Sequence, residues 1–225
     1  MTSQPSQTKP RLFIGNKNYS SWSMRPWLAL RWGGIAFDET VIPLLQGAAK
    51  TTAIRAVSPT GKVPVLVTDG VTIYDSLAIG LWAAEHAPSL LPTDPLVRAL
   101  GWSAISEMHA GFQALRRDLS MNMRRRVVVK AFADDVTADI ARVTELWTSL
   151  RTRHAESGPW LLGTRSLADA FYAPIVTRFR TYGVPLTSTM QAYAETVLAD
   201  ADVLAWERDA VAETWTMPGT DGLFG

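Results

Sequence analysis

The sequence predicts a small α/β domain followed by an all-α domain. Up to residue 86, short β-branched runs and helix-forming stretches alternate in the order strand, helix, strand, helix, strand, strand, helix, which is a βαβ unit joined to a ββα unit. After a proline-rich stretch, APSLLPTDP, the pattern changes to long helical periodicities with few β-branched clusters. We therefore place the first domain at 11–87, a linker at 88–95 and the second domain at 96–215.

The first βα pair begins directly after a polar lead. The apolar run at 11–14 predicts a strand, and the polar stretch 16–23 predicts a loop. Helix-forming residues at 25–32 end at a Gly-Gly pair, and Pro26 suits the first turn of that helix. A change from strand to helix is thus expected between residues 14 and 25.

The remaining elements of the first domain follow in order. Residues 35–45 are rich in β-formers and predict a second strand, and 48–56 predict a short helix that stops before Pro59. Two further strands are expected at 65–67 and 71–74, on either side of an Asp-Gly turn. The next helix starts with an Asp-Ser pair.

Composition narrows the classes of function. The chain has 225 residues, 47% hydrophobic and 19% charged, which is enough to bury a sizeable core. A formal net charge of +1 gives no general attraction to nucleic acid or to acidic membranes, so a small-molecule ligand is favoured. There are three histidines without metal-ligand spacing, and no cysteine, so we expect no metal and no enzyme-borne thiol nucleophile.

The absence of cysteine also fits a reducing cytoplasm, which is the location we expect. Residues 1–10 are polar, contain proline and lack the apolar core of a signal peptide, so they predict a disordered lead. No apolar run reaches the roughly 20 residues that span a bilayer. The sequence therefore predicts no membrane segment.

The most informative stretch runs from 58 to 79, because its features suit the binding of a short peptide. Pro64 cannot donate to a β-ladder, and a cis bond before it would turn the backbone of Val63 outward to pair with an extended ligand. Asp75 and Ser76 open a helix, where free N–H groups favour an anion and a carboxylate can bind an ammonium group. One site could thus bind both ends of an amino acid.

This stretch resembles the glutathione-binding half of a cytosolic glutathione S-transferase, and the similarity extends over about residues 11 to 215. The resemblance implies a thioredoxin-like first domain, an all-helical second domain and a homodimer. It implies that Val63, before a cis-Pro64, pairs with the cysteinyl backbone of glutathione, and that Asp75 and Ser76 bind its γ-glutamyl group. Glutathione would be a co-substrate.

Two lysines are candidates for the glycyl carboxylate of glutathione. Lys62 stands where the family often has Lys or Gln, and Lys50 lies in the predicted second helix. A surface lysine is often simply solvated, so solvation is the alternative interpretation for both.

The thiol-activating group is expected between the first strand and the first helix, because a hydroxyl at the positive end of a helix stabilises a thiolate. The run SSWSMR resembles the SSCSxR signature of the zeta class, which places the catalytic serine on Ser20 and its neighbour on Ser21, with Trp22 in the cysteine position. Aligning Arg25 with tyrosine-type classes would place the hydroxyl on Tyr19 instead. We favour Ser20, and interpret Arg25 as a support for the loop.

The acceptor substrate is expected to contact Trp22 and the first helices of the second domain. Met108, Phe112 and Met121 recur there, and adaptable methionine and flat aromatic groups suit apolar electrophiles. Such stripes at helical spacing also occur as core or dimer contacts. His109 lies beside them, and we interpret it as a surface or hydrogen-bonded histidine.

A second motif predicts stability rather than chemistry. Ser166 and Asp169, before the apolar AFYAPIV, form a variant of the capping box with Asp in place of Glu or Gln. The motif resembles the fold-nucleating motif of glutathione transferases at the start of a central buried helix.

The sequence thus predicts a glutathione transferase that adds the glutathione thiolate to small electrophiles. Three alternatives remain open at this stage: a zeta-like maleylacetoacetate isomerase, a glutathione-dependent peroxidase, and a non-catalytic glutathione-binding or interaction module.

Overall fold

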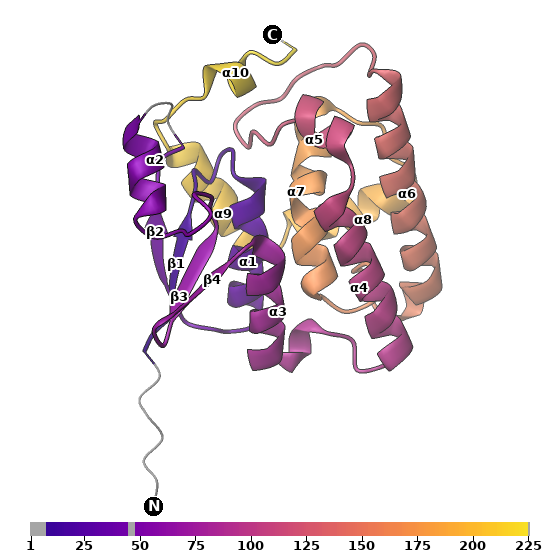
Figure 1. The fold of residues 1–225 in the computed structure, drawn as a ribbon. Helices are drawn as coiled ribbons and strands as arrows, with labels where there is room; N and C mark the ends of the chain where they lie inside the picture. The colour runs from indigo at the N-terminus through magenta and orange to yellow at the C-terminus, as the bar shows by residue number, and fades with distance from the viewer. Residues whose placement is uncertain (1–7, 45–47, 225) are drawn as a thin grey trace, which may run out of the picture.

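The computed structural model describes residues 8–44 and 48–224. All four strands lie before residue 75, and the rest of the described chain is mostly helical, which confirms the predicted fold class (Figure 1). The predicted lead at 1–10 falls mostly outside the described residues. The domain boundaries at 87 and 96 stay a prediction.

The strands form one mixed sheet in the order β2-β1-β3-β4. The central strand β1 pairs with β2 in parallel and with β3 in antiparallel orientation, and β3 continues antiparallel into β4. The strands are β1 (Arg11–Ile14), β2 (Asp38–Val41), β3 (Val65–Thr68) and β4 (Val71–Tyr74).

Strand β2 is shorter than predicted, because it spans four residues of the expected 35–45. It carries Asp38 and Glu39 at the edge of the sheet, where exposed charged side chains are tolerated. By contrast, Leu12, Ile14, Val65 and Leu66 of the two central strands are fully buried. The β-propensity of residues 35–45 therefore indicated the strand but not its length.

Helices α1 and α3 lie between the sheet and the helical part of the molecule, and α1 also packs against α7 (Figure 1). The helices of the first half are α1 (Ser21–Trp32), α2 (Ala48–Arg55) and α3 (Ser76–His86). The remaining α-helices are α4 (Pro95–Ala110), α5 (Gln113–Asp118), α6 (Asp134–His154), α7 (Leu167–Tyr182), α8 (Ser188–Leu198), α9 (Ala201–Ala212) and α10 (Pro218–Asp221), with short 3₁₀ turns at Pro88–Leu90 and Ala155–Ser157.

Helix α1 begins four residues earlier than predicted. Proline is common at the first helical position, so Pro26 indicated a start near residue 25, yet Pro26 lies inside α1 and the serine run forms its first turn. The earlier start places Trp22 on the helix instead of in a loop.

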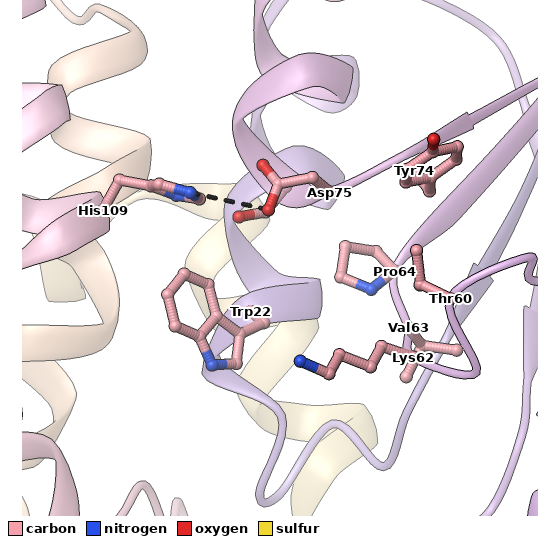
Figure 2. Close-up of a pocket in the computed structure, with 9 residues that line it drawn as sticks. Trp22, Thr60, Lys62, Val63, Pro64, Tyr74, Asp75 and His109 are labelled. Carbon is pink, nitrogen blue, oxygen red and sulfur yellow. Dashed lines mark ion pairs between the residues drawn. The ribbon is translucent and has the colours of Figure 1, made fainter.

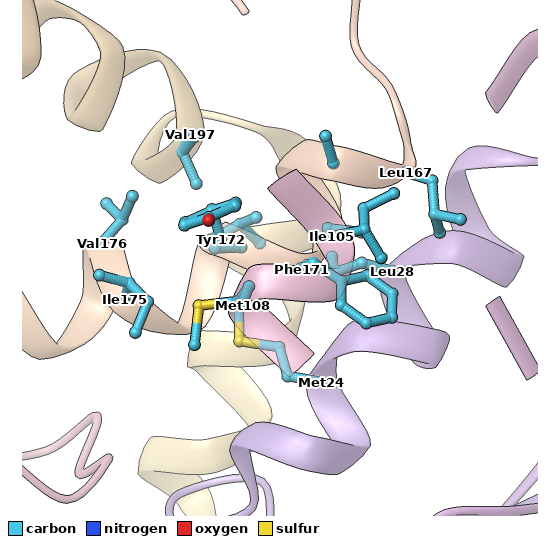
Figure 3. Close-up of a cluster of buried hydrophobic side chains, with 14 of the residues drawn as sticks. Met24, Leu28, Ile105, Met108, Leu167, Phe171, Tyr172, Ile175, Val176 and Val197 are labelled. Atoms are coloured by element: carbon cyan, nitrogen blue, oxygen red, sulfur yellow. The ribbon is translucent and has the colours of Figure 1, made fainter. Parts of the chain in front are cut away.

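The core joins the two halves of the molecule. Met24 and Leu28 of α1 meet Ile105 of α4 and Phe171 of α7 in one buried cluster (Figure 3). Helix α7 is buried along nearly its whole length, which explains the apolar run AFYAPIV within it. Burial on both sides of α1 fixes the end of the helix that faces the pocket.

Candidate functional site

One pocket gathers most of the residues predicted to bind glutathione. It has a volume of about 460 Å³. Its walls come from α1, the segment before β3, the turn from β4 into α3, and α4 (Figure 2). It is lined by Trp22, Thr60, Lys62, Val63, Pro64, Tyr74, Asp75, Ser76 and His109.

The segment before β3 forms one wall. The Val63–Pro64 peptide bond is cis, as the sequence analysis predicted. Val63 is half-buried, and the exposed Lys62 side chain extends toward Trp22 across the pocket (Figure 2). The Lys62 amide donates to the Ser58 hydroxyl at 3.2 Å, which fixes the turn that carries both residues.

Asp75 connects the opposite wall to the helical half. It is the N-cap of α3, with a φ of 78°, and its Oδ1 accepts a hydrogen bond from the Leu77 amide at 2.7 Å. Its Oδ2 lies 3.5 Å from Nε2 of His109 on α4. One carboxylate oxygen therefore caps the helix, and the other faces the pocket beside His109 (Figure 2).

Ser76 is buried, with 1% of its surface exposed. Ser76 is one of the residues that line the pocket, and its Oγ has no hydrogen-bond partner among the described residues. A buried hydroxyl without a partner costs stability. A ligand in the pocket would supply the missing partner.

Tyr19, one of the two candidates for the activating hydroxyl, does not line this pocket. Its hydroxyl donates to Asp221 at 2.9 Å and accepts hydrogen bonds from Arg124 at 2.8 Å and from the Met217 amide at 3.2 Å. Burial and the bond to Asp221 raise its pKa. The hydroxyl of Tyr19 thus fastens the C-terminal segment instead of facing the pocket.

Ser20 and Ser21 lie at the N-terminus of α1, next to Trp22, but neither lines the pocket. The Ser20 hydroxyl donates to Ser23 Oγ at 2.8 Å, and Ser23 also accepts from the Gly15 amide. Ser21 Oγ accepts from the Arg178 guanidinium at 2.9 Å. Both hydroxyls therefore have protein partners in this structure.

The residues predicted to form an acceptor wall, Met108, Phe112 and Met121, do not line this pocket. Met108 is 0% exposed, Phe112 is 6% exposed and Met121 is 1% exposed, and all three belong to the hydrophobic core. Their helical spacing reflected core packing, which was the alternative interpretation. Of the predicted acceptor-site residues, Trp22 lines the pocket.

Positive charge surrounds Trp22 instead. The guanidinium carbons of Arg25 and Arg116 lie 4.2 Å and 4.7 Å from its ring centroid, and the His109 ring meets it edge-on at 5.4 Å. Burial, followed by repulsion from Arg116 and Arg178, lowers the pKa of Arg25 to about 9. Burial also lowers the pKa of His109 despite the opposing field of Asp75.

Two further predictions concern groups away from this pocket. Lys50, predicted to bind the glycyl carboxylate, lies in α2, and its side chain is outside the described part of the structure. Within residues 8–44 and 48–224, no cluster of three His, Cys, Asp or Glu side chains could hold a metal ion. No helix in the same ranges is long and apolar enough to cross a membrane.

Comparison with known proteins points to the same family as the pocket residues do. Residues 19–86 match the family described as glutathione S-transferase, N-terminal domain. The chain is 31% identical over 167 residues to glutathione S-transferase Z2 of Arabidopsis thaliana, covering 70% of this chain and 74% of that protein. The chain belongs to the glutathione S-transferase family.

Further matches extend this result. Over 112 residues the chain is 34% identical to a probable maleylacetoacetate isomerase of Caenorhabditis elegans, covering 49% of this chain and about half of the length of that relative (51%). A glutathione transferase homologue from Burkholderia gl BGR1, solved with bound glutathione, has the same fold with a TM-score of 0.68 at 20% identity, covering 92% of this chain and all of that one. This transferase therefore shares its fold with proteins of low sequence identity.

Sequence reasoning missed several residues of the site. Thr60 and Tyr74 carry no motif, and His109 was interpreted as an ordinary histidine although it lines the pocket and faces Asp75. The signal for His109 was its position next to Met108 on the first helix of the second domain. Arg116 gave no sequence signal, because its proximity to Trp22 depends on how α5 packs.

Proposed function

We propose that this protein binds glutathione in the 460 Å³ pocket, activates its thiol and transfers the thiolate to a small electrophile. Membership of the family gives the class of enzyme, a glutathione S-transferase. The observation that carries the proposal is the convergence of Val63, Asp75 and Ser76 on one pocket. These are the residues to which the family motif assigns the peptide backbone and the γ-glutamyl group.

The proposed binding mode uses complementary charge and hydrogen bonds. The Oδ2 oxygen of Asp75, which faces His109, takes the α-ammonium of the γ-glutamyl group, and the unpartnered hydroxyl of Ser76 bonds to its carboxylate. The backbone of Val63 pairs with the cysteinyl residue, and Lys62 approaches the glycyl carboxylate. Every polar end of glutathione then has a partner.

Ser20 is the proposed donor to the thiolate. It precedes α1, whose N-terminal dipole favours an anion, and its hydroxyl can exchange Ser23 for a sulfur anion without leaving the end of the helix. In the transfer step the thiol first releases its proton to solvent, the thiolate then forms a C–S bond at an electrophilic carbon, and the displaced π-electron pair takes up a proton from solvent. Ser21 is the second candidate.

Isomerisation of maleylacetoacetate is a second candidate function, since the relative from Caenorhabditis elegans bears that name. It needs the same thiolate, added reversibly. Homodimer formation, a cytoplasmic location and a role in detoxification belong to this proposal as expectations from the family.

The deciding experiment is a titration of bound glutathione against pH, following the ultraviolet absorbance of the thiolate. We expect the wild type to lower the thiol pKa below its ordinary value near 8.5, by about two units. Ser20→Ala should restore the ordinary value. Tyr19→Phe should leave the shift unchanged, because the Tyr19 hydroxyl is bonded to Asp221.

Ser21→Ala serves as the matched control for Ser20→Ala. If Ser21→Ala alone abolished the shift, Ser21 would replace Ser20 as the donor. Binding with an unshifted pKa in the wild type would mean a non-catalytic glutathione-binding protein, and no binding would refute the assignment of the pocket.

A further inference from the structure

His109 is the pocket residue that comes from the helical half of the molecule, near the end of α4. Its Nε2 lies 3.5 Å from Oδ2 of Asp75, within ion-pair distance (Figure 2). The Trp22 ring packs edge-on against the imidazole, with 5.4 Å between the ring centroids. The helical half of the molecule thus contacts the carboxylate that is proposed to bind glutathione.

The two nitrogens of the His109 ring lie in different surroundings. Nδ1 is buried and has no hydrogen-bond partner among the described residues, whereas Nε2 faces Asp75. A neutral imidazole carries one proton, and at Nδ1 that proton would be a buried donor without an acceptor. The neutral ring therefore carries its proton on Nε2, beside the Asp75 carboxylate, and ionisation adds a proton at the buried Nδ1.

Charged groups on three elements act on this ionisation. Burial is the largest influence and lowers the pKa of His109. Asp75, at the start of α3, raises that pKa, whereas Arg25 of α1 and Arg116 of α5 lower it. Arg116 is held beside His109, because its Nη1 donates to the His109 carbonyl oxygen at 3.2 Å. The imidazolium form therefore depends on Asp75 for its counter-charge.

Glutathione brings a second cation to the same carboxylate. In the proposed binding mode its α-ammonium group pairs with Oδ2 of Asp75, the oxygen that faces His109. The other oxygen, Oδ1, accepts the hydrogen bond of the Leu77 amide at 2.7 Å. Two cations beside one carboxylate repel each other. The ammonium group and the imidazolium therefore compete for Oδ2.

We propose that His109 is a further residue of the glutathione site, which binds the α-ammonium group at Asp75 when the imidazole is neutral and opposes that binding when it is charged. The inference rests on the proposed function. It applies to ligands with a free α-amino group, because a ligand without this cation does not compete for Asp75. Glutathione binding should then displace a proton from His109 and weaken as the pH falls.

The first test uses the unmodified protein and follows its three histidines by NMR against pH, with and without saturating S-methylglutathione. This probe has no ionisable thiol, so thiol activation does not contribute to the result. We expect the pKa of His109 to fall by about one unit when the probe binds. His86 and His154 lie outside the pocket and are internal controls, whose titration curves should coincide in the two states. An unchanged pKa of His109 would overturn the proposal.

An analogue without the cation separates competition from simple burial of the ring by a ligand. In the deamino analogue of S-methylglutathione, hydrogen replaces the α-ammonium group and the α-carboxylate is kept. This analogue should not lower the pKa of His109, because it leaves Asp75 to the imidazolium. An equal fall with both ligands would contradict the competition.

The affinity provides a second test. Between pH 7 and pH 5 the ammonium group and the carboxylates of S-methylglutathione keep their charge. Calorimetric titration should give a Kd about threefold higher at pH 5 for the wild type, and a change of at most about 1.5-fold for His109→Gln. His86→Gln, at an exposed histidine, is the matched control and should keep the wild-type dependence.

The same pH dependence in the wild type and in His109→Gln would overturn the role of His109 while leaving glutathione binding intact. If S-methylglutathione failed to bind at either pH, the proposed function itself would be refuted.

Discussion

The hydroxyl of Ser76 is buried beside the pocket and has no hydrogen-bond partner among the described residues. The preceding residue, Asp75, uses one carboxylate oxygen to accept a hydrogen bond from the Leu77 amide. Asp75 therefore has a structural role as the N-cap of α3 in addition to its proposed role in binding. Ser76 has no such structural role. The two neighbours can be separated by mutation for this reason.

Ser76→Ala should weaken glutathione binding without lowering stability. The variant removes a hydrogen bond to the bound carboxylate, which should raise the Kd for glutathione about tenfold. It also removes an unsatisfied buried hydroxyl, so the melting temperature should stay the same or rise. Calorimetric titration and thermal unfolding measure the two effects, with Ser103→Ala as the control because the Ser103 hydroxyl is exposed on α4.

A lower melting temperature with unchanged binding would contradict the role of Ser76 as a ligand residue and indicate a structural role instead.

At this scale the sequence predicted the residues that share a local motif. Val63, Pro64, Asp75 and Ser76 lie within 14 positions of one another, and the structure brings all of them to one pocket. Tyr19 could not be assigned in the same way, because its partner Asp221 is 202 positions away. Arg116 was missed for a similar reason.

At the scale of elements, the start of α7 depends on one buried carboxylate. Asp169 Oδ2 accepts from the Ser166 amide and hydroxyl, both at 2.9 Å, and its Oδ1 accepts from the Leu161 amide at 3.0 Å and the Tyr193 hydroxyl at 3.2 Å. The predicted capping box of Ser166 and Asp169 is confirmed, because the Asp169 carboxylate accepts a hydrogen bond from the Ser166 amide. The carboxylate also joins α7 to α8 and to the preceding loop.

Asp169→Ala should destabilise the protein by about 3 kcal/mol, because it leaves several buried donors without an acceptor. For a chain of this size the melting temperature should fall by about 10 °C. Thermal and urea unfolding measure the loss. Asp94→Ala is a control, since Asp94 caps α4 at the surface and should cost about 1 kcal/mol; equal costs would contradict the role of burial.

The ionisation of Asp169 predicts that the free energy of unfolding depends on pH. Burial raises the pKa of Asp169 to about 6, against 3.8 in the unfolded chain, so the folded state binds the additional proton between these values. Stability from this group is therefore gained as the pH falls from 7 to 5 and lost as the pH rises. Relative to Asp169→Asn, the wild type should gain about 1 kcal/mol over that interval.

The element scale also shows where propensity misleads. The serine run before α1 has the polarity of a loop, yet it forms the first helical turn, because that turn is buried against α7 and its serines bond to Arg178 and Gly15. Helix positions could be predicted from the sequence, but this boundary depends on tertiary contacts.

At the scale of the whole molecule, the loop that precedes α1 is held by residues from the far end of the chain. Glu213 accepts from the amides of Lys17 at 2.6 Å and Asn18 at 3.1 Å. Arg124 bonds to the carbonyl oxygens of Glu213 and Trp215, both at 2.7 Å. The loop with the proposed thiol-activating serine thus owes its shape to the C-terminal segment.

Glu213→Ala should loosen this loop and weaken the proposed thiol activation, while the proposed glutathione contacts at Val63 and Ser76 should be preserved. We expect amide hydrogen exchange at Lys17 and Asn18 to accelerate at least tenfold, and the pKa of the bound thiol to rise, with little change in Kd. Glu156→Ala, at an exposed position, is the control. Unchanged exchange at both amides would show that Glu213 does not hold the loop in place.

The distance along the chain between Lys17 and Glu213, 196 positions, has a consequence for biosynthesis. The N-terminal sheet can form while the rest of the chain is still being translated, since domains fold as they leave the ribosome. The acceptor for the loop amides emerges much later, so a nascent chain can have a complete thioredoxin-like domain while the loop with the proposed thiol-activating serine is still disordered. Activity would then appear after the folding of that domain, when residue 213 has left the exit tunnel.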